Sequence, residues 1–218
     1  MASDRQGGFT LIELLVGMTI FAVVSIAMYQ TVFAASRGSD VARSVANTTQ
    51  EARLGFNRMI RDTREANTIQ ATSSTSYTIQ VDFDLNGTLA AAGTLNTQGD
   101  AETLTFAYNP TARTISLSGE TLMTGVSAAS STTGPCGAEI FCYVGNKLEY
   151  DGVAGLPKDG TVTCLELDRS GVPGVGNNNG LCDALEWANL TGVHLSMKVT
   201  ARSSSTDFRA EAELRNVR

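Results

Sequence analysis

Residues 9–35 read FTLIELLVGMTIFAVVSIAMYQTVFAA, a segment in which Glu13 is the only charged side chain. A helix that crosses the hydrocarbon core of a bilayer needs about 20 mainly apolar residues, and this segment supplies them. A secretory signal peptide is the alternative interpretation, but the run is longer than the apolar region of such a peptide and no A-x-A-like cleavage site closes it. The segment therefore predicts a helix buried in lipid or among other helices.

The same helix is predicted to continue well beyond the apolar segment. No proline occurs between Phe9 and Ala66, so nothing in the sequence forces a break. After Ala35, apolar and small residues recur at spacings of four and three, which is typical of one face of a helix. This face consists of Val41, Val45, Thr48, Ala52, Phe56, Met59 and Thr63. We expect one long helix with an apolar first half and an amphipathic second half.

Beyond Thr68 apolar residues recur at every second position, which predicts strands of a sheet covered on one face. The main predicted strands run through 77–83, 104–108, 115–117, 193–199 and 208–214, and shorter candidates lie at 140–144, 147–150 and 161–167. Polar and small residues predict loops at 71–76, 89–99, 127–137 and 170–180. The fold class is α+β: a long N-terminal helix whose amphipathic half packs on an antiparallel β-sheet body.

The net charge of −6 is distributed unevenly along the 218 residues. Residues 34–66 hold six arginines and four acidic residues, whereas residues 67–218 hold nine basic and sixteen acidic residues. Affinity for nucleic-acid phosphates depends on clustered Lys and Arg. The acidic body therefore argues against direct nucleic-acid binding as a function of this chain.

The residues at the start of the apolar segment, Gly7-Gly8-Phe9-Thr10-Leu11-Ile12-Glu13-Leu14-Leu15-Val16, resemble the N-terminal motif of type IV prepilins and type II secretion pseudopilins. The resemblance implies a pilin-like fold, cleavage between Gly8 and Phe9 by a membrane prepilin peptidase, and N-methylation of Phe9. It also implies that Glu13 is the assembly glutamate. The chain then divides into a leader (1–8), a transmembrane and filament-core helix (9–35), a stem (36–66) and a β-rich head (67–218).

Two features refine the resemblance. The leader has Asp4 next to Arg5, so the charges of these two side chains cancel, whereas the family leader is usually basic. The apolar helix also lacks the proline that is common in major pilins. The missing proline favours a minor pilin or pseudopilin, and the body looks most like the PilW/PulJ-type group. The implied role is assembly of a pilus or secretion pseudopilus with other pilin subunits. The implied location is the bacterial inner membrane, with the head on the extracytoplasmic side, and the filament after assembly.

Glu13 has a physical interpretation as well as a family one. A lone carboxylate in a membrane segment costs a few kcal/mol, and such residues usually mark function. In a filament, the positive amine of a neighbouring subunit's Phe9 would pair with Glu13 and set the axial register. A protonated Glu13 near the membrane interface is the alternative interpretation.

The four cysteines, Cys136, Cys142, Cys164 and Cys182, all lie in the body. An extracytoplasmic body is in an oxidising compartment, where disulfides persist. Three pairings are possible, and we favour Cys136–Cys142 with Cys164–Cys182 because each bond would close a glycine-rich loop. A zinc site is the alternative, although the chain has no C-x-x-C pair and a single histidine.

Two acidic loops are candidate calcium sites, and calcium is the only cofactor that the sequence suggests. Asp82, Asp84 and Asn86, followed by glycine, match the opening of a calcium-binding loop, but the twelfth position is glycine instead of glutamate. The second loop runs from Asp168 to Glu186. Some pseudopilins carry calcium in body loops, and the resemblance extends that expectation here. The simpler interpretation is a strand residue followed by a turn.

The sequence offers little support for catalysis. The only histidine, His194, falls on the polar face of a predicted strand beside Ser196 and Lys198, with no nucleophile at a suitable spacing. We therefore expect a structural subunit and no enzyme. The alternative function is a membrane-tethered extracytoplasmic enzyme or ligand-binding domain that keeps its N-terminal anchor, which would leave the chain uncut at Gly8.

Overall fold

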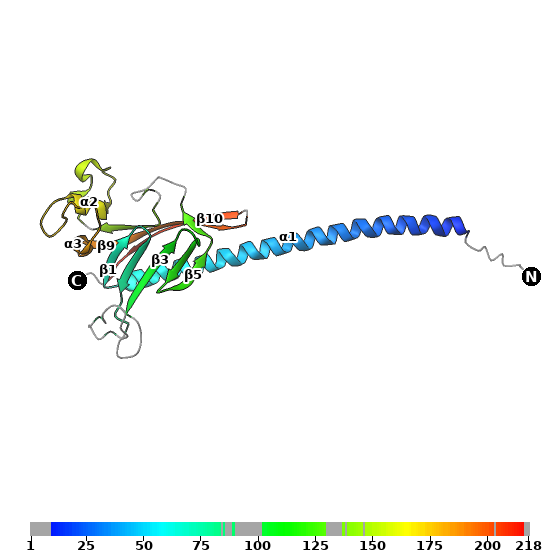
Figure 1. Ribbon diagram of the computed structural model, residues 1–218, viewed down its shortest axis with the longest axis horizontal. Coiled ribbons are helices and arrows are strands. Elements are labelled where there is room, and N and C mark those ends of the chain that lie inside the picture. The colour runs from blue at the N-terminus through cyan, green and yellow to red at the C-terminus, as the bar shows by residue number, and fades with distance from the viewer. Residues whose placement is uncertain are drawn as a thin grey trace, which may run out of the picture. The chain divides into compact units, whose positions relative to one another are not determined.

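In the computed structural model, the described residues are 10–215 apart from 84, 86–88, 90–101, 130–136, 138, 146 and 203 (Figure 1). The chain divides into two units, Met1–Ala46 and Asn47–Arg218. The helix α1 (Leu11–Glu65) runs through both units. The described part of the first unit is helical from Leu11 onward, and the second unit holds the strands.

The helix α1 is continuous over 55 residues, which confirms the single long helix predicted from the sequence. In the second unit it buries one face, and the buried positions follow the predicted spacing of three and four. These buried residues are Ala52, Gly55, Phe56, Met59, Asp62 and Thr63. Asp62 is the unexpected member of this face. Its carboxylate is 3.1 Å from Arg61 and 3.4 Å from Arg58, so it lies buried but paired.

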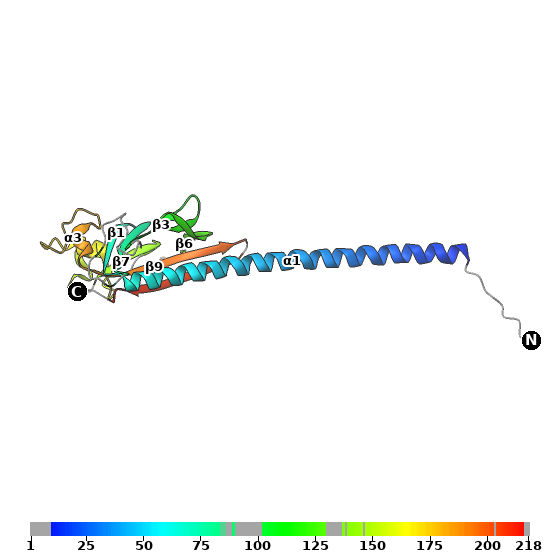
Figure 2. The ribbon, with the colours of Figure 1, turned by 90° about the horizontal axis from the view of Figure 1, so that it is seen from below.

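The strands form two antiparallel sheets beside the C-terminal part of α1 (Figures 1 and 2). The first sheet has the order β1 (Thr68–Ser73), β2 (Ser76–Gln80), β3 (Thr103–Asn109), β4 (Thr114–Leu117) and β5 (Glu120–Thr124). The second has the order β10 (Ser204–Glu213), β9 (Leu190–Ala201), β7 (Phe141–Gly145) and β8 (Val162–Thr163), with β6 (Val126–Ala128) also paired to β9. The predicted α+β fold is therefore correct.

Aromatic side chains join the helix and the two sheets in one core. Tyr77 of β2 contacts Phe106 of β3 and Phe141 of β7, with ring centroids 5.1 and 5.0 Å apart. The Tyr77 hydroxyl lies 3.0 Å from the hydroxyl of Thr63 on α1, which satisfies both buried groups. Burial raises the pKa of Tyr77 well above its ordinary value, so the phenol stays protonated.

The alternation of β2, β3, β4 and β9 confirms the pattern predicted from the sequence, because apolar side chains point inward at every second residue. Three strand predictions were wrong. Strand β2 ends at Gln80, and Phe83 is 44 % exposed instead of continuing the buried face. The stretch 147–150 holds a 3-10 turn, η1 (Leu148–Tyr150), followed by a second one, η2 (Val153–Gly155).

The third wrong prediction concerns residues 161–167, where β8 is followed directly by the helix α2 (Cys164–Arg169). The Thr163 hydroxyl accepts a hydrogen bond from the Glu166 backbone N–H, and the Glu166 carboxylate accepts one from the Thr163 N–H. This capping box starts a helix where period-two alternation indicated a strand. A second short helix, α3 (Ala184–Trp187), is capped in the same way by Asp183 and Glu186.

Candidate functional site

The N-terminal end of α1 holds Glu13 in a reciprocal capping arrangement with Thr10. The Glu13 carboxylate accepts hydrogen bonds from the Thr10 backbone N–H (3.3 Å) and hydroxyl (3.2 Å), and the Thr10 hydroxyl accepts one from the Glu13 N–H (3.3 Å). This is the capping-box pattern of a threonine followed three residues later by glutamate. The arrangement orders the start of the helix and directs the carboxylate toward its N-terminal end. Gly8 and Phe9, the other two predicted motif residues, lie outside the described residues.

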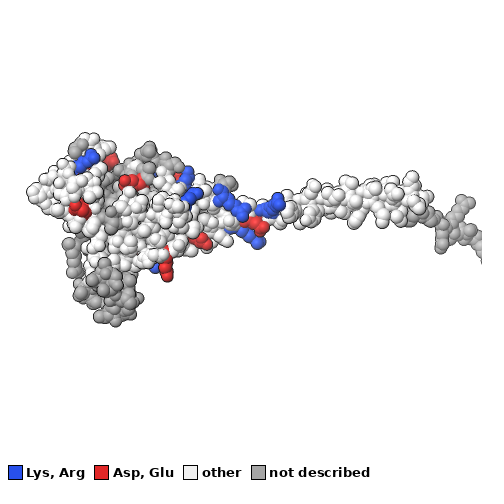
Figure 3. Space-filling model, viewed as in Figure 1, with Lys and Arg blue, Asp and Glu red and all other residues white. Residues whose placement is uncertain are grey.

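The side chains that follow Glu13 are apolar and uncovered. The large apolar residues from Leu14 to Phe33 are all exposed, and a shallow apolar depression beside Glu13 is lined by Leu14, Gly17, Met18 and Phe21. The most apolar 18-residue stretch of this helix has a mean hydropathy of 2.3, and none of its residues is buried. In Figure 3 this part of α1 shows no charged side chains on the visible face, whereas acidic and basic residues are scattered over the head. An exposed apolar surface of this extent marks a contact with a membrane or with another protein.

The head contains one of the two predicted disulfides among its described residues. Cys164 at the start of α2 is bonded to Cys182 before α3, with the two Cα atoms 5.8 Å apart. The bond closes the loop between the two short helices, as predicted. None of the described cysteines is a free thiol. Cys136 lies outside the described residues, so its pairing with Cys142 stays a prediction.

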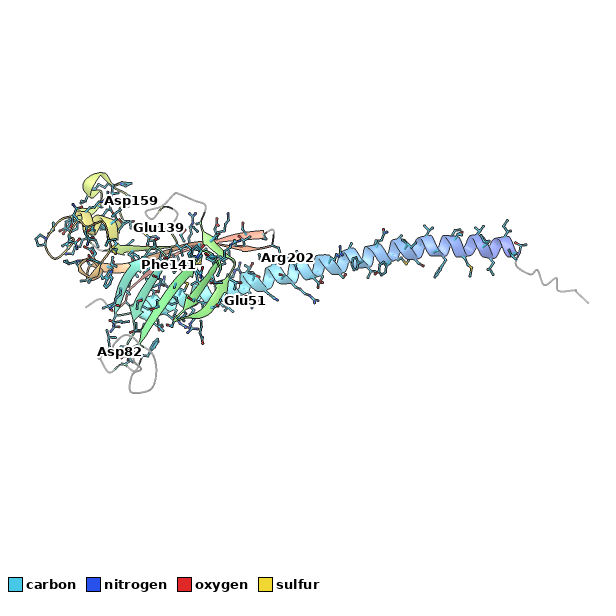
Figure 4. All side chains as sticks on the ribbon, in the orientation of Figure 1. Glu51, Asp82, Glu139, Phe141, Asp159 and Arg202 are labelled. Carbon is cyan, nitrogen blue, oxygen red and sulfur yellow. A yellow bond between two sulfur atoms is a disulfide. The ribbon has the colours of Figure 1, made fainter. Side chains whose placement is uncertain are left out.

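The two acidic loops proposed as calcium sites are described to different extents. In the first, Asp82 is described at the end of the sheet (Figure 4), whereas Asp84 and Asn86 lie outside the described residues. In the second, the buried Asp168 carboxylate accepts hydrogen bonds from the backbone N–H groups of Asn179 (2.9 Å) and Gly180 (3.0 Å). Within the described part of the chain, no three acidic, histidine or cysteine side chains converge as metal ligands. Asp168 thus anchors its loop by direct contacts with the backbone.

Asp183 binds residues of the same loop through its carboxylate, and its titration makes the stability of the head depend on pH. Its carboxylate accepts hydrogen bonds from the Leu185 N–H (3.1 Å) and the side-chain amides of Asn177 (3.0 Å) and Asn179 (2.8 Å). These bonds, led by the one from Leu185, lower the pKa of Asp183 to about 2. In the unfolded chain an aspartate titrates at about 3.9. The stabilisation by Asp183 is therefore fully present above about pH 4 and is lost as the pH falls toward 2.

We expect Asp183→Asn to reduce this pH dependence, because asparagine caps helices about as well as aspartate but does not titrate. Urea unfolding of the full chain in detergent, measured at several pH values between 2 and 4.5, checks it. The free energy of unfolding should fall less steeply with acidification in the variant than in the wild type. Equal slopes would show that the Asp183 hydrogen bonds do not contribute. Burial raises the pKa of the neighbouring Glu186, and the Asp183 carboxylate adds to that rise, so the comparison reports the titration of Asp183 together with its coupling to Glu186.

His194 has a structural partner in place of a catalytic one. Its Nε2 atom lies 3.1 Å from a carboxylate oxygen of Glu211, the residue directly opposite it on β10. On the same face of β9 and β10, Ser196 pairs with Arg209 and Lys198 with Asp207 in register. The residues around His194 thus form cross-strand polar pairs on the face of the sheet turned away from Phe56 and the core.

Sequence reasoning missed Thr10 as the partner of Glu13 and Asp62 as a buried charge. The first could have been found, because Thr10-x-x-Glu13 immediately before an apolar helix is a sequence signature of a helix start. The burial of Asp62 was hard to predict from the sequence. A charged residue next to a buried threonine on an amphipathic helix ordinarily lies at the edge of the exposed face.

Comparison with known families finds the prokaryotic N-terminal methylation motif at residues 3–29. The matched region includes Gly8, Phe9 and Glu13 and the first part of α1. Comparisons with curated proteins and with solved structures found no significant match. The motif and the long helix on antiparallel sheets agree with the resemblance stated from residues 7–16. The chain therefore carries the prepilin-type N-terminal methylation signal, which supports the type IV pilin and pseudopilin family and no particular member of it.

Proposed function

We propose that the chain is a minor pilin or pseudopilin, a structural subunit that takes part in the initiation or the tip of a type IV pilus or a type II secretion pseudopilus. The observation that supports it best is the methylation motif at the start of a long helix whose apolar side chains are uncovered from Leu14 to Phe33. An uncovered apolar helix of this length has two favourable environments, the bilayer and a bundle of similar helices. A pilin-like subunit occupies the first before assembly and the second afterwards.

In this proposal the chain has four parts: a leader (1–8), a core helix (9–35), a stem (36–66) and a head (67–218). Prepilin peptidase hydrolyses the peptide bond between Gly8 and Phe9, and the new amine of Phe9 is methylated. The core helix holds the precursor in the inner membrane as a single span. The head faces the extracytoplasmic side, where oxidising conditions maintain the Cys164–Cys182 bond.

Glu13 and Phe9 carry the assembly chemistry of this proposal. Removal of the leader creates a positive amine four residues before the Glu13 carboxylate, in a segment without any other charge. When core helices of sister subunits pack together, the Phe9 amine of one subunit neutralises Glu13 of the next. The cost of an unpaired charge in an apolar environment, a few kcal/mol, then favours a single axial register.

Processing at Gly8 provides the experimental test. We expect the chain produced in membranes with a prepilin peptidase to lose its first eight residues, and a Gly8→Leu variant to retain them because leucine blocks the cleavage position. Gly7→Ala, one residue farther from the cut, is the matched control and should be processed normally. The measurement is the intact mass of the membrane-extracted protein. A wild-type chain that keeps its leader would contradict the proposal and favour a permanently tethered domain.

A further inference from the structure

Two aromatic residues and one arginine lie four positions apart on one face of α1, at the end of its apolar segment. The rings of Tyr29 and Phe33 are nearly parallel, with centroids 6.1 Å apart. The guanidinium carbon of Arg37 lies 4.2 Å from the centroid of the Phe33 ring, within the range of a cation–π contact. We refer to Tyr29, Phe33 and Arg37 as the aromatic–arginine stripe.

The stripe is exposed within the part of the chain that the structure describes. Tyr29 is 71 % and Phe33 is 45 % exposed, and Arg37 is exposed as well. Arg37 also has a potential partner three residues on, in Asp40, but no ion pair joins these two described side chains. The guanidinium edge therefore has N–H groups free to bind an anion while its face rests on Phe33.

The position of the stripe along the helix matches the thickness of a bilayer. Glu13 and Arg37 bound a run of 23 residues without any charge. At 1.5 Å per residue, the two charges are about 36 Å apart along the axis. The hydrocarbon core is about 30 Å thick, with headgroups on either side. With Glu13 near one boundary, Phe33 falls at the opposite boundary and Arg37 about 6 Å beyond it, at the level of the lipid phosphates.

The chemistry of the three side chains fits this level. Tyrosine is enriched at membrane interfaces because its ring is apolar and its hydroxyl is polar. Arginine binds phosphate oxygens through two parallel N–H groups, with a geometry that lysine lacks. Stacking on Phe33 limits the orientations of the guanidinium, so less conformational entropy is lost when it binds a phosphate.

We propose that the aromatic–arginine stripe is a lipid-headgroup contact: Arg37 binds the phosphate of an extracytoplasmic-leaflet phospholipid and, with Tyr29 and Phe33, sets the depth of α1 in the membrane before assembly. The inference rests on the membrane-anchored stage of the proposed function. It extends that proposal by naming the lipid partner and the residues that fix the depth. Extraction of the subunit into a filament would then require the release of this contact.

A depth measurement in vesicles tests the inference. The full chain carries a single tryptophan, Trp187, so a Trp187→Phe background leaves room for a reporter. Phe33→Trp places the reporter in the stripe and keeps the ring under Arg37, because tryptophan is the best cation–π acceptor. The protein is inserted at low density into phosphatidylcholine vesicles containing phosphatidylglycerol. Quenching by lipids that carry a spin label near the headgroup is compared with quenching by lipids labelled deep in the acyl chain.

We expect the reporter to be quenched mainly by the shallow label. Arg37→Gln removes the phosphate contact, so the reporter should move deeper and the ratio of shallow to deep quenching should fall about twofold. Arg37→Lys keeps the charge without the planar guanidinium and should give an intermediate ratio. Arg43→Gln is the matched control: it removes one positive charge six residues farther along the same helix, and it should leave the ratio unchanged.

The outcomes separate this inference from the proposed function. A reporter that neither label quenches would show that the helix is outside the bilayer, and would overturn both. A reporter quenched mainly by the deep label, a ratio unchanged by Arg37→Gln, or an equal fall with Arg43→Gln would overturn the stripe alone. An unchanged ratio at low protein density is also the result expected if sister helices, and not lipid, are the partners of Arg37.

Discussion

A Glu13→Ala variant should be produced, inserted into the membrane and cut at Gly8, yet its incorporation into filaments should fall by more than tenfold. Glu13 is the only charged side chain between Phe9 and Ser36, so no other residue can neutralise the Phe9 amine of a neighbouring subunit. An uncompensated charge in the apolar core costs a few kcal/mol, and each 1.4 kcal/mol changes an equilibrium about tenfold. The measurement is the amount of variant in the sheared filament fraction, relative to the amount in the membrane.

Glu13→Gln is the matched control, because it separates the two roles of this side chain. A glutamine at this position still accepts hydrogen bonds and completes the capping box with Thr10, but it carries no charge. If pairing with the Phe9 amine drives assembly, the glutamine variant should fail as the alanine variant does. Normal assembly of either variant would show that the charge of Glu13 is unnecessary, and Glu13 would then be only a helix cap.

Met59→Ala should strongly destabilise the head. Met59 is 0 % exposed on the face of α1 that packs against the sheets, and truncation of a buried methionine to alanine costs about 2–5 kcal/mol through lost burial and the cavity left behind. The free energy of unfolding of the full chain in detergent, from a urea titration followed by far-ultraviolet circular dichroism, gives the measurement. A loss of this size would show that the C-terminal part of α1 is an integral part of the head.

Leu54→Ala is the control on the same helix, because Leu54 is 64 % exposed and loses little buried area when it is shortened. We expect its free energy of unfolding to stay within about 0.5 kcal/mol of the wild type, as is usual for surface positions. Equal destabilisation by the two variants would contradict the orientation of this helix face.

The helix and the longer strands could be predicted because their periodicity is local. The spacing from Ala52 to Thr63 identified the buried face of α1, and alternation identified β3 and β9. Residues 71–73 and 127–128 were assigned to loops, yet they belong to β1 and β6. Their small and polar side chains have weak strand preference, and their strand conformation depends on pairing with β2 and β9.

The parts of the candidate site that could be predicted are those formed by residues close together in the sequence. The motif at Gly8, Phe9 and Glu13 could be recognised from sequence alone, because its residues are separated by fixed offsets. The pairing of Cys164 with Cys182 followed from the composition of the loop between them. The contact between Thr63 and Tyr77 could not be predicted, because it joins α1 to a strand through tertiary packing that no local pattern encodes.

The most direct test of the central claim is the identity of the N-terminal residue of this chain in sheared, purified filaments. Mass spectrometry of the N-terminal peptide should detect the chain there, beginning at Phe9 and carrying one added methyl group on its amine. The membrane fraction of the same cells should contain both precursor and processed forms. A chain that is absent from filaments and begins at Met1 in the membrane would contradict the account, and would identify a permanently anchored extracytoplasmic protein instead.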